Sequence, residues 1–134
     1  MKEMKDKQVL IVGMARSGVA AARMLSRLGA KLTLTDTRNS EQMASAIEQL
    51  SDIDADWRLG TEPDALIEGK DYIILSPSVY YWAPWVEKAK QNGTEVVSEL
   101  QLGAWFTQGD FVAVTGTNGK TTTTTLIGEI FKAN

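Results

Sequence analysis

Short apolar runs alternate along the chain with longer segments whose apolar residues recur at helical spacing. The first run, QVLIVG at residues 8–13, is continuous and ends in glycine, which is typical of a strand buried on both faces of a parallel sheet. The next segment, residues 17–29, spaces its apolar side chains at helical intervals and ends in Gly29, where a helix commonly stops. The pattern therefore predicts a strand followed directly by a helix.

The same alternation continues to the end of the chain. Further strands are predicted at residues 31–36, 55–60, 71–76, 94–98 and 111–115. Helical segments are predicted at residues 40–50, with Ser40 as the N-cap, and at 62–69, 83–93, 99–109 and the last segment of the chain. Strands that alternate with helices favour a parallel sheet with helices on both faces. We expect an α/β fold: a Rossmann-like, doubly wound sheet of five parallel strands, followed by a strand, a phosphate loop and a helix.

The organisation of the chain changes near residues 98–109. The length of 134 residues is typical of a single domain. The strands before this point can complete a small sheet, whereas one strand, loop and helix after it are too little to bury a core alone. We predict a Rossmann-like domain at residues 1–98 and, at residues 99–134, a linker and the beginning of a second, incomplete domain.

Composition removes several kinds of chemistry. The chain has no cysteine and no histidine, which excludes disulfides, thiol catalysis and most zinc sites. The net charge of −3 and the pI near 5.0 argue against a general nucleic-acid binder. No apolar run approaches the ~20 residues of a membrane span, and the N-terminus lacks the pattern of a signal peptide. We expect a cytoplasmic protein with no nucleic-acid or membrane partner.

A first glycine-containing loop, GMARSG at residues 13–18, joins the first strand to the first helix. The dinucleotide fingerprint G-x-G-x-x-G would require glycine where Ala15 stands. Asp36 ends the second strand near the spacing of a ribose-binding acid, and Arg38 follows it. Three interpretations stay open: an NAD(P) site, a site for another nucleotide, or a tight turn in which Asp36 only caps the residues that follow.

A second loop, GTNGKTT at residues 116–122, follows the last predicted strand. The Walker A pattern would place its first glycine where Val114 stands, so that motif fails as written. Backbone N–H groups at the start of a helix still favour an anion, Lys120 can reach the β- and γ-phosphates, and the Thr121 hydroxyl can contact Mg²⁺. The predicted triphosphate cradle comprises Gly116, Thr117, Asn118, Gly119, Lys120, Thr121 and Thr122.

These motifs resemble those of the Mur ligases. GTNGKTT after VAVT is similar to the ATP loop of that family, and IVGMARSG with LTDTR is similar to the N-terminal domain of its D-glutamate-adding branch. VVSELQL is similar to the junction that follows this domain, so the resemblance covers essentially the whole chain. It implies that residues 1–98 bind a UDP-sugar and that residues 99–134 begin the ATP-binding domain.

The resemblance also implies roles for individual residues. Arg16 and Ser17 would contact the uridine diphosphate, while Asp36, Thr37 and Arg38 would hold the uracil and nearby groups. The residues of the second loop would cradle the ATP phosphates, with Lys120 neutralising the transferring phosphoryl group. Thr121 or Thr122 would meet Mg²⁺.

The reaction is implied as well. The family uses ATP and Mg²⁺ to convert the substrate carboxylate into an acyl phosphate, which the amine of the incoming amino acid attacks to form an amide. The substrates would be UDP-N-acetylmuramoyl-L-alanine and D-glutamate, and the ligase would act as a monomer in peptidoglycan synthesis. The acidic Mg²⁺ ligand, histidine and modified lysine that the family carries later are not among these residues. We therefore expect the front part of a longer enzyme, inactive by itself.

Two features depart from the family pattern. In Ser76-Pro77-Ser78, Ser78 stands where the family has glycine. If the family needs that glycine for a positive φ or for close approach of the substrate, Ser78 would strain or weaken the contact with the UDP-sugar. The aromatic residues that follow have three possible roles: packing, an aromatic floor for uracil or sugar, or a partner surface. They are Tyr80, Tyr81, Trp82 and Trp85.

Two other functions compete with the ligase interpretation. One is a stand-alone Rossmann module that binds NAD or another nucleotide. The other is a small P-loop phosphotransferase, for which ATP should protect the chain against heat.

Overall fold

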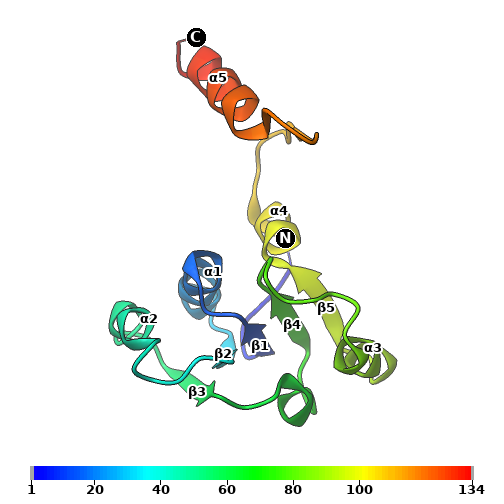
Figure 1. Cartoon of the computed structure of the whole chain (residues 1–134). Coiled ribbons are helices and arrows are strands. Elements are labelled where there is room, and N and C mark those ends of the chain that lie inside the picture. The colour runs from blue at the N-terminus through cyan, green and yellow to red at the C-terminus, as the bar shows by residue number, and fades with distance from the viewer. Residues whose placement is uncertain (1, 134) are drawn as a thin grey trace.

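A five-stranded, wholly parallel sheet forms the centre of the computed structural model, which describes residues 2–133. The strand order is β3-β2-β1-β4-β5, as Figure 1 shows. The predicted α/β fold with five parallel strands is confirmed. The strands are β1 (Gln8–Val12), β2 (Lys31–Asp36), β3 (Ala55–Leu59), β4 (Tyr72–Leu75) and β5 (Glu95–Ser98).

Burial explains the different strength of the strand signals. β1 lies at the centre, where Ile11 pairs with Leu34 of β2 on one side and with Ile74 of β4 on the other. All three side chains are buried, so the apolar run of β1 is continuous. β3 lies at the edge and alternates partly buried and exposed residues, with Asp56 and Arg58 exposed. Its sequence signal is weaker for that reason.

Helices cover both faces of the sheet. They are α1 (Arg16–Arg27), α2 (Ala44–Gln49), the 3₁₀ turn η1 (Pro63–Leu66), α3 (Pro84–Gln91), α4 (Glu99–Phe106) and α5 (Lys120–Ala133). One buried cluster joins Leu25 of α1, Ala46 of α2 and Leu102 of α4 to one face. A second cluster joins Val86 and Ala89 of α3 to the other. Figure 1 shows α1 and α2 on the opposite side of the sheet from α3.

The start of α2 differs from the prediction. The helix begins at Ala44, and its N-cap is Met43 rather than Ser40. Asn39 and Gln42 exchange two hydrogen bonds, in which each backbone N–H donates to the other's side-chain oxygen at 3.1 and 3.0 Å. This reciprocal pair resembles a capping box, and it holds residues 40–43 in turns, outside the helix.

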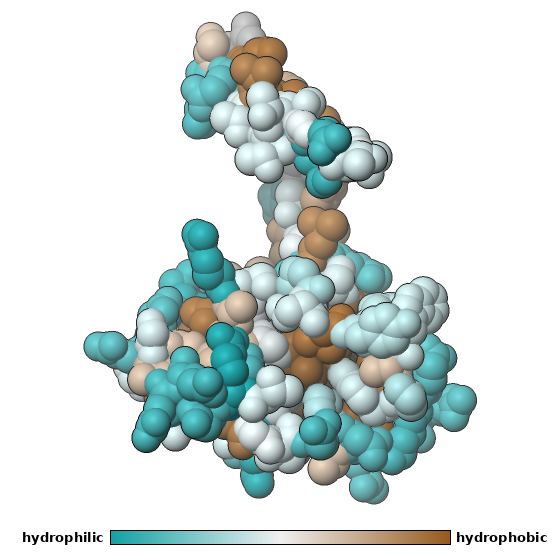
Figure 2. All heavy atoms as spheres, viewed as in Figure 1, coloured by the Kyte–Doolittle hydropathy of each residue, from teal (hydrophilic) through white to brown (hydrophobic). Residues whose placement is uncertain are grey.

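The strand predicted at residues 111–115 is wrong for this chain. These residues form neither strand nor helix, and Phe111 and Val112 are exposed. A parallel strand requires a neighbouring backbone to pair with, and these residues have none within the described part of the chain. The helix predicted after the second loop is present as α5, which has no buried residue. Figure 1 shows it standing away from the sheet, and Figure 2 shows apolar atoms exposed along it.

Candidate nucleotide-binding site

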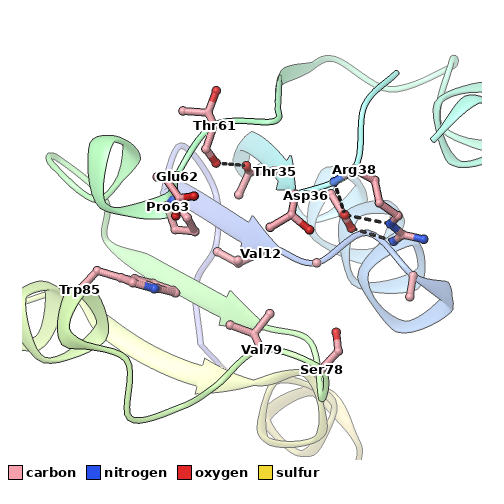
Figure 3. A pocket seen from close by; sticks show the side chains of 13 residues that line it. Val12, Thr35, Asp36, Arg38, Thr61, Glu62, Pro63, Ser78, Val79 and Trp85 are labelled. Carbon is pink, nitrogen blue, oxygen red and sulfur yellow. Dashed lines mark hydrogen bonds and ion pairs between the residues drawn. The ribbon is translucent and has the colours of Figure 1, made fainter. Parts of the chain in front are cut away.

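A cleft of about 560 Å³ lies at the carboxyl ends of β1, β2 and β4. The sheet order reverses between β1 and β4, and ligands of open α/β sheets bind in the crevice outside the strand ends at such a point. Figure 3 shows the Asp36–Arg38 pair and Trp85 at opposite ends of the cleft, with Val12 between them. The wall is built from Val12, Gly13 and Ala15, from Thr35–Arg38, from Thr61–Pro63, and from Ser78, Val79 and Trp85.

Two glycines shape the first loop. Gly13 has φ +93°, and a Cβ there would lie 2.6 Å from Cβ of Ser76. A Cβ on Gly18 would lie 2.1 Å from the carbonyl oxygen of Gly13. Both positions therefore need glycine for the fold itself. Ala15, where the dinucleotide fingerprint has glycine, is exposed and lines the cleft, so its methyl group adds bulk where a ligand would approach.

Asp36 connects the first loop to the end of β2. Its Oδ2 accepts hydrogen bonds from the Met14 N–H at 2.8 Å and from Nη2 of Arg38 at 2.8 Å. Its Oδ1 accepts from the N–H of Arg38 at 3.0 Å and from Nε of Arg38 at 2.9 Å. A carboxylate has about four acceptor sites, so the protein itself occupies all of them. This carboxylate is 7% exposed and positions its neighbours.

The environment of Asp36 keeps it ionised. The Arg38 side chain that donates to the carboxylate, together with the Met14 N–H, holds its pKa well below the usual range, although burial opposes the shift. Arg38 in turn is fixed by two hydrogen bonds from its guanidinium, while 45% of its side chain stays exposed. The remaining guanidinium N–H groups are available at the cleft wall for a carbonyl or phosphate oxygen.

The other predicted residues of this site are distributed around the same edge. Thr37 and Ser78 line the cleft and are exposed. Arg16 and Ser17 begin α1 immediately after Ala15, and they do not line the cleft wall. The N-cap of α1 makes no side-chain hydrogen bond, so no side chain competes at that end for the first N–H groups of the helix.

Ser78 does not strain its turn. Among residues 2–133 Asp6 alone, of the non-glycine residues, has a positive φ. The turn is closed by the Val79 N–H, which donates to the Ser76 carbonyl at 2.9 Å, and the Ser76 and Ser78 hydroxyl oxygens are 3.5 Å apart. The backbone conformation of this turn is therefore accessible to serine.

The aromatic residues after β4 divide into two groups. Trp85 lines the cleft and packs against the core beneath α3. Tyr80 and Trp82 are 69% and 66% exposed and do not line the cleft. The Tyr81 ring meets the Trp82 ring edge-on, and Nζ of Lys90 lies 4.4 Å from the centre of the Tyr81 ring. Packing thus accounts for Trp85 and Tyr81, and only Trp85 is in a position to contact a ligand in the cleft.

The segment Thr61–Pro63 completes the cleft, although its sequence predicted no site residue. It follows β3 and reaches the site because β3 lies beside β2 in the sheet. The Thr35 hydroxyl donates to the Arg58 carbonyl at 2.6 Å and ties the two strands together there. The only sequence signal was Pro63, which indicates a turn and no chemistry.

The second loop lies apart from the cleft. Residues 116–122 are exposed, and none of them lines the cleft. Gly116 and Gly119 have φ of +150° and +78°, so the loop uses conformations that favour glycine. Nζ of Lys120 donates to the Gly116 carbonyl at 2.7 Å, which draws the lysine back across the loop. Thr121 and Thr122 follow in the first turn of α5.

Residues 2–133 hold neither a cluster of metal-binding side chains nor a helix that could span a membrane. In the range 2–133, no three acidic side chains gather as they would around a metal ion. No helix in that range combines the length and apolarity needed to cross a membrane.

The comparisons with known proteins agree with one another. The Mur ligase MurD-like N-terminal domain family matches residues 7–98. The chain is 47% identical over 131 residues to the UDP-N-acetylmuramoylalanine–D-glutamate ligase of Geobacter sp. (strain M21), and 38% identical over 130 residues to that of Caldanaerobacter subterraneus subsp. tengcongensis. These alignments cover 98% and 97% of this chain but 29% of each relative, so the chain spans less than a third of their length.

Solved structures show the same fold. A pseudomurein peptide ligase type C from Methanothermus fervidus matches 96% of this chain and 26% of its own, with a TM-score of 0.58 and 25% identity. Shikimate dehydrogenase from Aquifex aeolicus matches 77% of this chain and 46% of its own, with a TM-score of 0.51. At 18% identity this second likeness concerns the fold only.

Proposed function

Because this chain belongs to the Mur ligase family, in which it matches the MurD-like N-terminal domain, we propose that it binds UDP-N-acetylmuramoyl-L-alanine. In this proposal it is the front part of a ligase that adds D-glutamate to that substrate in peptidoglycan synthesis. The observation that carries the proposal is the cleft at the sheet reversal, where Asp36 fixes the guanidinium of Arg38 and leaves its remaining donors open.

The cleft offers complementary groups for a uridine diphosphate. Next to the cleft wall, at the start of α1, the backbone N–H groups and the positive charge of Arg16 suit the diphosphate. The free donors of Arg38 suit the carbonyl oxygens of uracil, and the Thr37 and Ser78 hydroxyls line the same wall. Ser17 stands in the first turn of α1 next to Arg16, outside the cleft wall itself. Asp36 acts through Arg38 and Met14, since its own oxygens are already occupied.

The second loop fits the phosphates of ATP. The loop backbone is uncrowded at both glycines: a Cβ on Gly116 would lie 3.7 Å from the Asn118 carbonyl oxygen, and one on Gly119 would have no neighbour within 4 Å. Lys120 donates to a carbonyl oxygen that a phosphate oxygen would replace, and Thr117 and Asn118 lie between the glycines. The hydroxyl of Thr121 or Thr122 would contact Mg²⁺. When bound, ATP would supply the phosphoryl group that activates the substrate carboxylate, and Mg²⁺ would neutralise phosphate charge.

We propose further that the 134 residues do not catalyse the reaction alone. Every residue of the second loop is exposed, and no wall in the described structure encloses a triphosphate. Phosphoryl transfer depends on groups preorganised around the transferring charge and on the exclusion of water. The proposal places the ligase in the cytoplasm and treats it as a monomer.

Calorimetric titration tests the proposal against the NAD alternative. The chain is titrated in turn with UDP-N-acetylmuramoyl-L-alanine, UDP and NAD⁺. We expect the two uridine nucleotides to bind and NAD⁺ not to bind. Binding of NAD⁺ without binding of either uridine nucleotide would overturn the proposal.

A further inference from the structure

Glu99 carries a buried oxygen without a hydrogen-bond partner. Its Oε2 is the one buried side-chain nitrogen or oxygen in this state among residues 2–133. Buried polar atoms in folded proteins are nearly always hydrogen-bonded, because leaving one unpaired is unfavourable. An acceptor of this kind therefore indicates a donor from outside the described residues.

Glu99 stands at the same edge of the sheet as the nucleotide cleft. It is the first residue of α4 and directly follows β5, so it lies where the carboxyl ends of β4 and β5 meet. It lines a hollow of about 340 Å³ together with Ser76, Pro77, Tyr81, Ser98 and Leu100. Val79 lines both this hollow and the nucleotide cleft. The two cavities are therefore neighbours, separated by the turn at residues 76–79.

The residues around the hollow do not satisfy the carboxylate. No lysine or arginine is among the residues that line it. The Ser98 oxygen accepts a hydrogen bond from the Gln101 N–H at 3.2 Å as the cap of α4. The Ser76 hydroxyl lies 3.5 Å from that of Ser78, and the Tyr81 hydroxyl lies 3.5 Å from the Val96 carbonyl, to which it donates. The polar groups that line the hollow thus have other partners.

We propose that Glu99 accepts a hydrogen bond from the N-acetylmuramoyl-L-alanine part of the substrate. This inference rests on the proposed function, because it assumes that uridine diphosphate occupies the neighbouring cleft. A ligand that continues along the strand ends from β1 past β4 meets the Glu99 hollow next. The donor is a neutral N–H or O–H group, such as a sugar hydroxyl or an amide, since the alanine carboxylate would be repelled by Glu99. The last torsion of a glutamate is broad, so the carboxylate of Glu99 can turn about that bond to meet a donor in the hollow that it lines.

Calorimetry on Glu99→Gln tests this assignment with two probes. UDP reaches only the nucleotide cleft, whereas UDP-N-acetylmuramoyl-L-alanine also reaches Glu99. Glutamine keeps the size of the side chain but removes its charge and half of its acceptor capacity. We expect the affinity for the long ligand to fall about 10- to 100-fold, with the affinity for UDP unchanged. Glu95→Gln, at the opposite end of β5, is the matched control and should change neither affinity.

Each other outcome has a defined meaning. Unchanged affinity of Glu99→Gln for both ligands would show that the oxygen has only a structural role and would overturn the assignment. An equal loss for both ligands would overturn it too, because Glu99 would then act through the nucleotide cleft. If the unmodified chain binds neither ligand, the proposed function fails, and this inference fails with it. Thermal unfolding of both variants checks that each is folded, and Glu99→Asp provides a second variant that keeps the charge but shortens its reach.

Discussion

The backbone N–H of Met14 donates to Oδ2 of Asp36 at 2.8 Å, across the gap between the first glycine loop and the end of β2. The two residues are 22 positions apart in the chain and are brought together by the pairing of β1 with β2. The same carboxylate holds Arg38, so one buried acid fixes both the loop and the cation of the candidate site. A change at Asp36 should therefore affect stability as well as binding.

Asp36→Asn should destabilise the chain by about 1–3 kcal/mol at pH 7, because it weakens hydrogen bonds that a charged acceptor makes to buried or partly buried donors. The pKa of Asp36 is lowered in the folded state. Its stabilising effect is therefore complete above the unfolded pKa of about 3.9 and declines as the pH falls below that value. Urea unfolding of the unmodified chain and of Asp36→Asn between pH 7 and pH 3 measures the difference in their free energy of unfolding. This difference should shrink below about pH 4.

The control for this experiment is Asp56→Asn. Asp56 pairs with Arg58 on the exposed edge strand, with both side chains more than half exposed. Exposed pairs of this kind contribute about 0–1 kcal/mol. If Asp36→Asn lowers the free energy of unfolding no more than Asp56→Asn does, the structural role given to Asp36 is contradicted.

Gly18→Ala should destabilise the chain by at least about 2 kcal/mol, because the new Cβ would have to displace the Gly13 carbonyl and with it the loop. Gly128→Ala is the matched control within a helix. No atom lies within 4 Å of a Cβ placed there, so alanine should be neutral or stabilising by up to about 1 kcal/mol. Denaturant unfolding measures the stability of both variants. Equal changes in the free energy of unfolding would show that the first loop is less tightly packed than in this structure.

Arg38→Ala should weaken UDP binding about 10- to 100-fold, because it removes the cation whose free donors line the cleft. Calorimetry measures the affinity, and thermal unfolding confirms that the variant is folded. Arg58→Ala, which removes an exposed arginine outside the cleft, should bind UDP as the unmodified chain does. Unchanged UDP affinity of the Arg38 variant would remove this residue from the site.

A chain that ends at residue 109 should fold and keep its stability within about 0.5 kcal/mol. It retains α4, whose Leu102 is buried in the main core, and loses residues that are nearly all exposed. This experiment also tests whether residues 110–134, the last part of the predicted second segment, are needed for the fold. Unfolding of the shorter chain would show that the last segment supports the sheet.

The sequence predicted those elements whose signal is local. Ile11 and its neighbours are buried on both faces, and that burial produces the continuous apolar run of β1. Residues 111–115 carry a similar apolar run but form no strand. A strand needs a neighbouring strand to pair with, and the apolar pattern does not show whether one is present. Ser40 is a good cap by residue type, yet the reciprocal bonds of Asn39 and Gln42 begin the turn one residue earlier.

The candidate site was predictable in the same uneven way. Asp36 and Arg38 stand at a strand end, where the pattern places ligand-binding groups, but their mutual hydrogen bonds appear only in three dimensions. Thr61 and Glu62 reach the cleft through the order of strands in the sheet, for which residue type is no guide. The aromatic segment after β4 could not be divided from sequence, because only the turn of the chain sends Trp85 inward and Trp82 outward.

Amide chemical shifts of the ¹⁵N-labelled chain, followed during titration with UDP, test most directly whether the cleft binds the uridine nucleotide. We expect the largest changes at Ala15–Ser17, at the start of α1, and at Thr37 and Arg38 in the cleft wall. Residues 116–122, which lie apart from it, should stay unchanged. Changes confined to residues 116–122, or spread without preference for the cleft, would contradict this expectation.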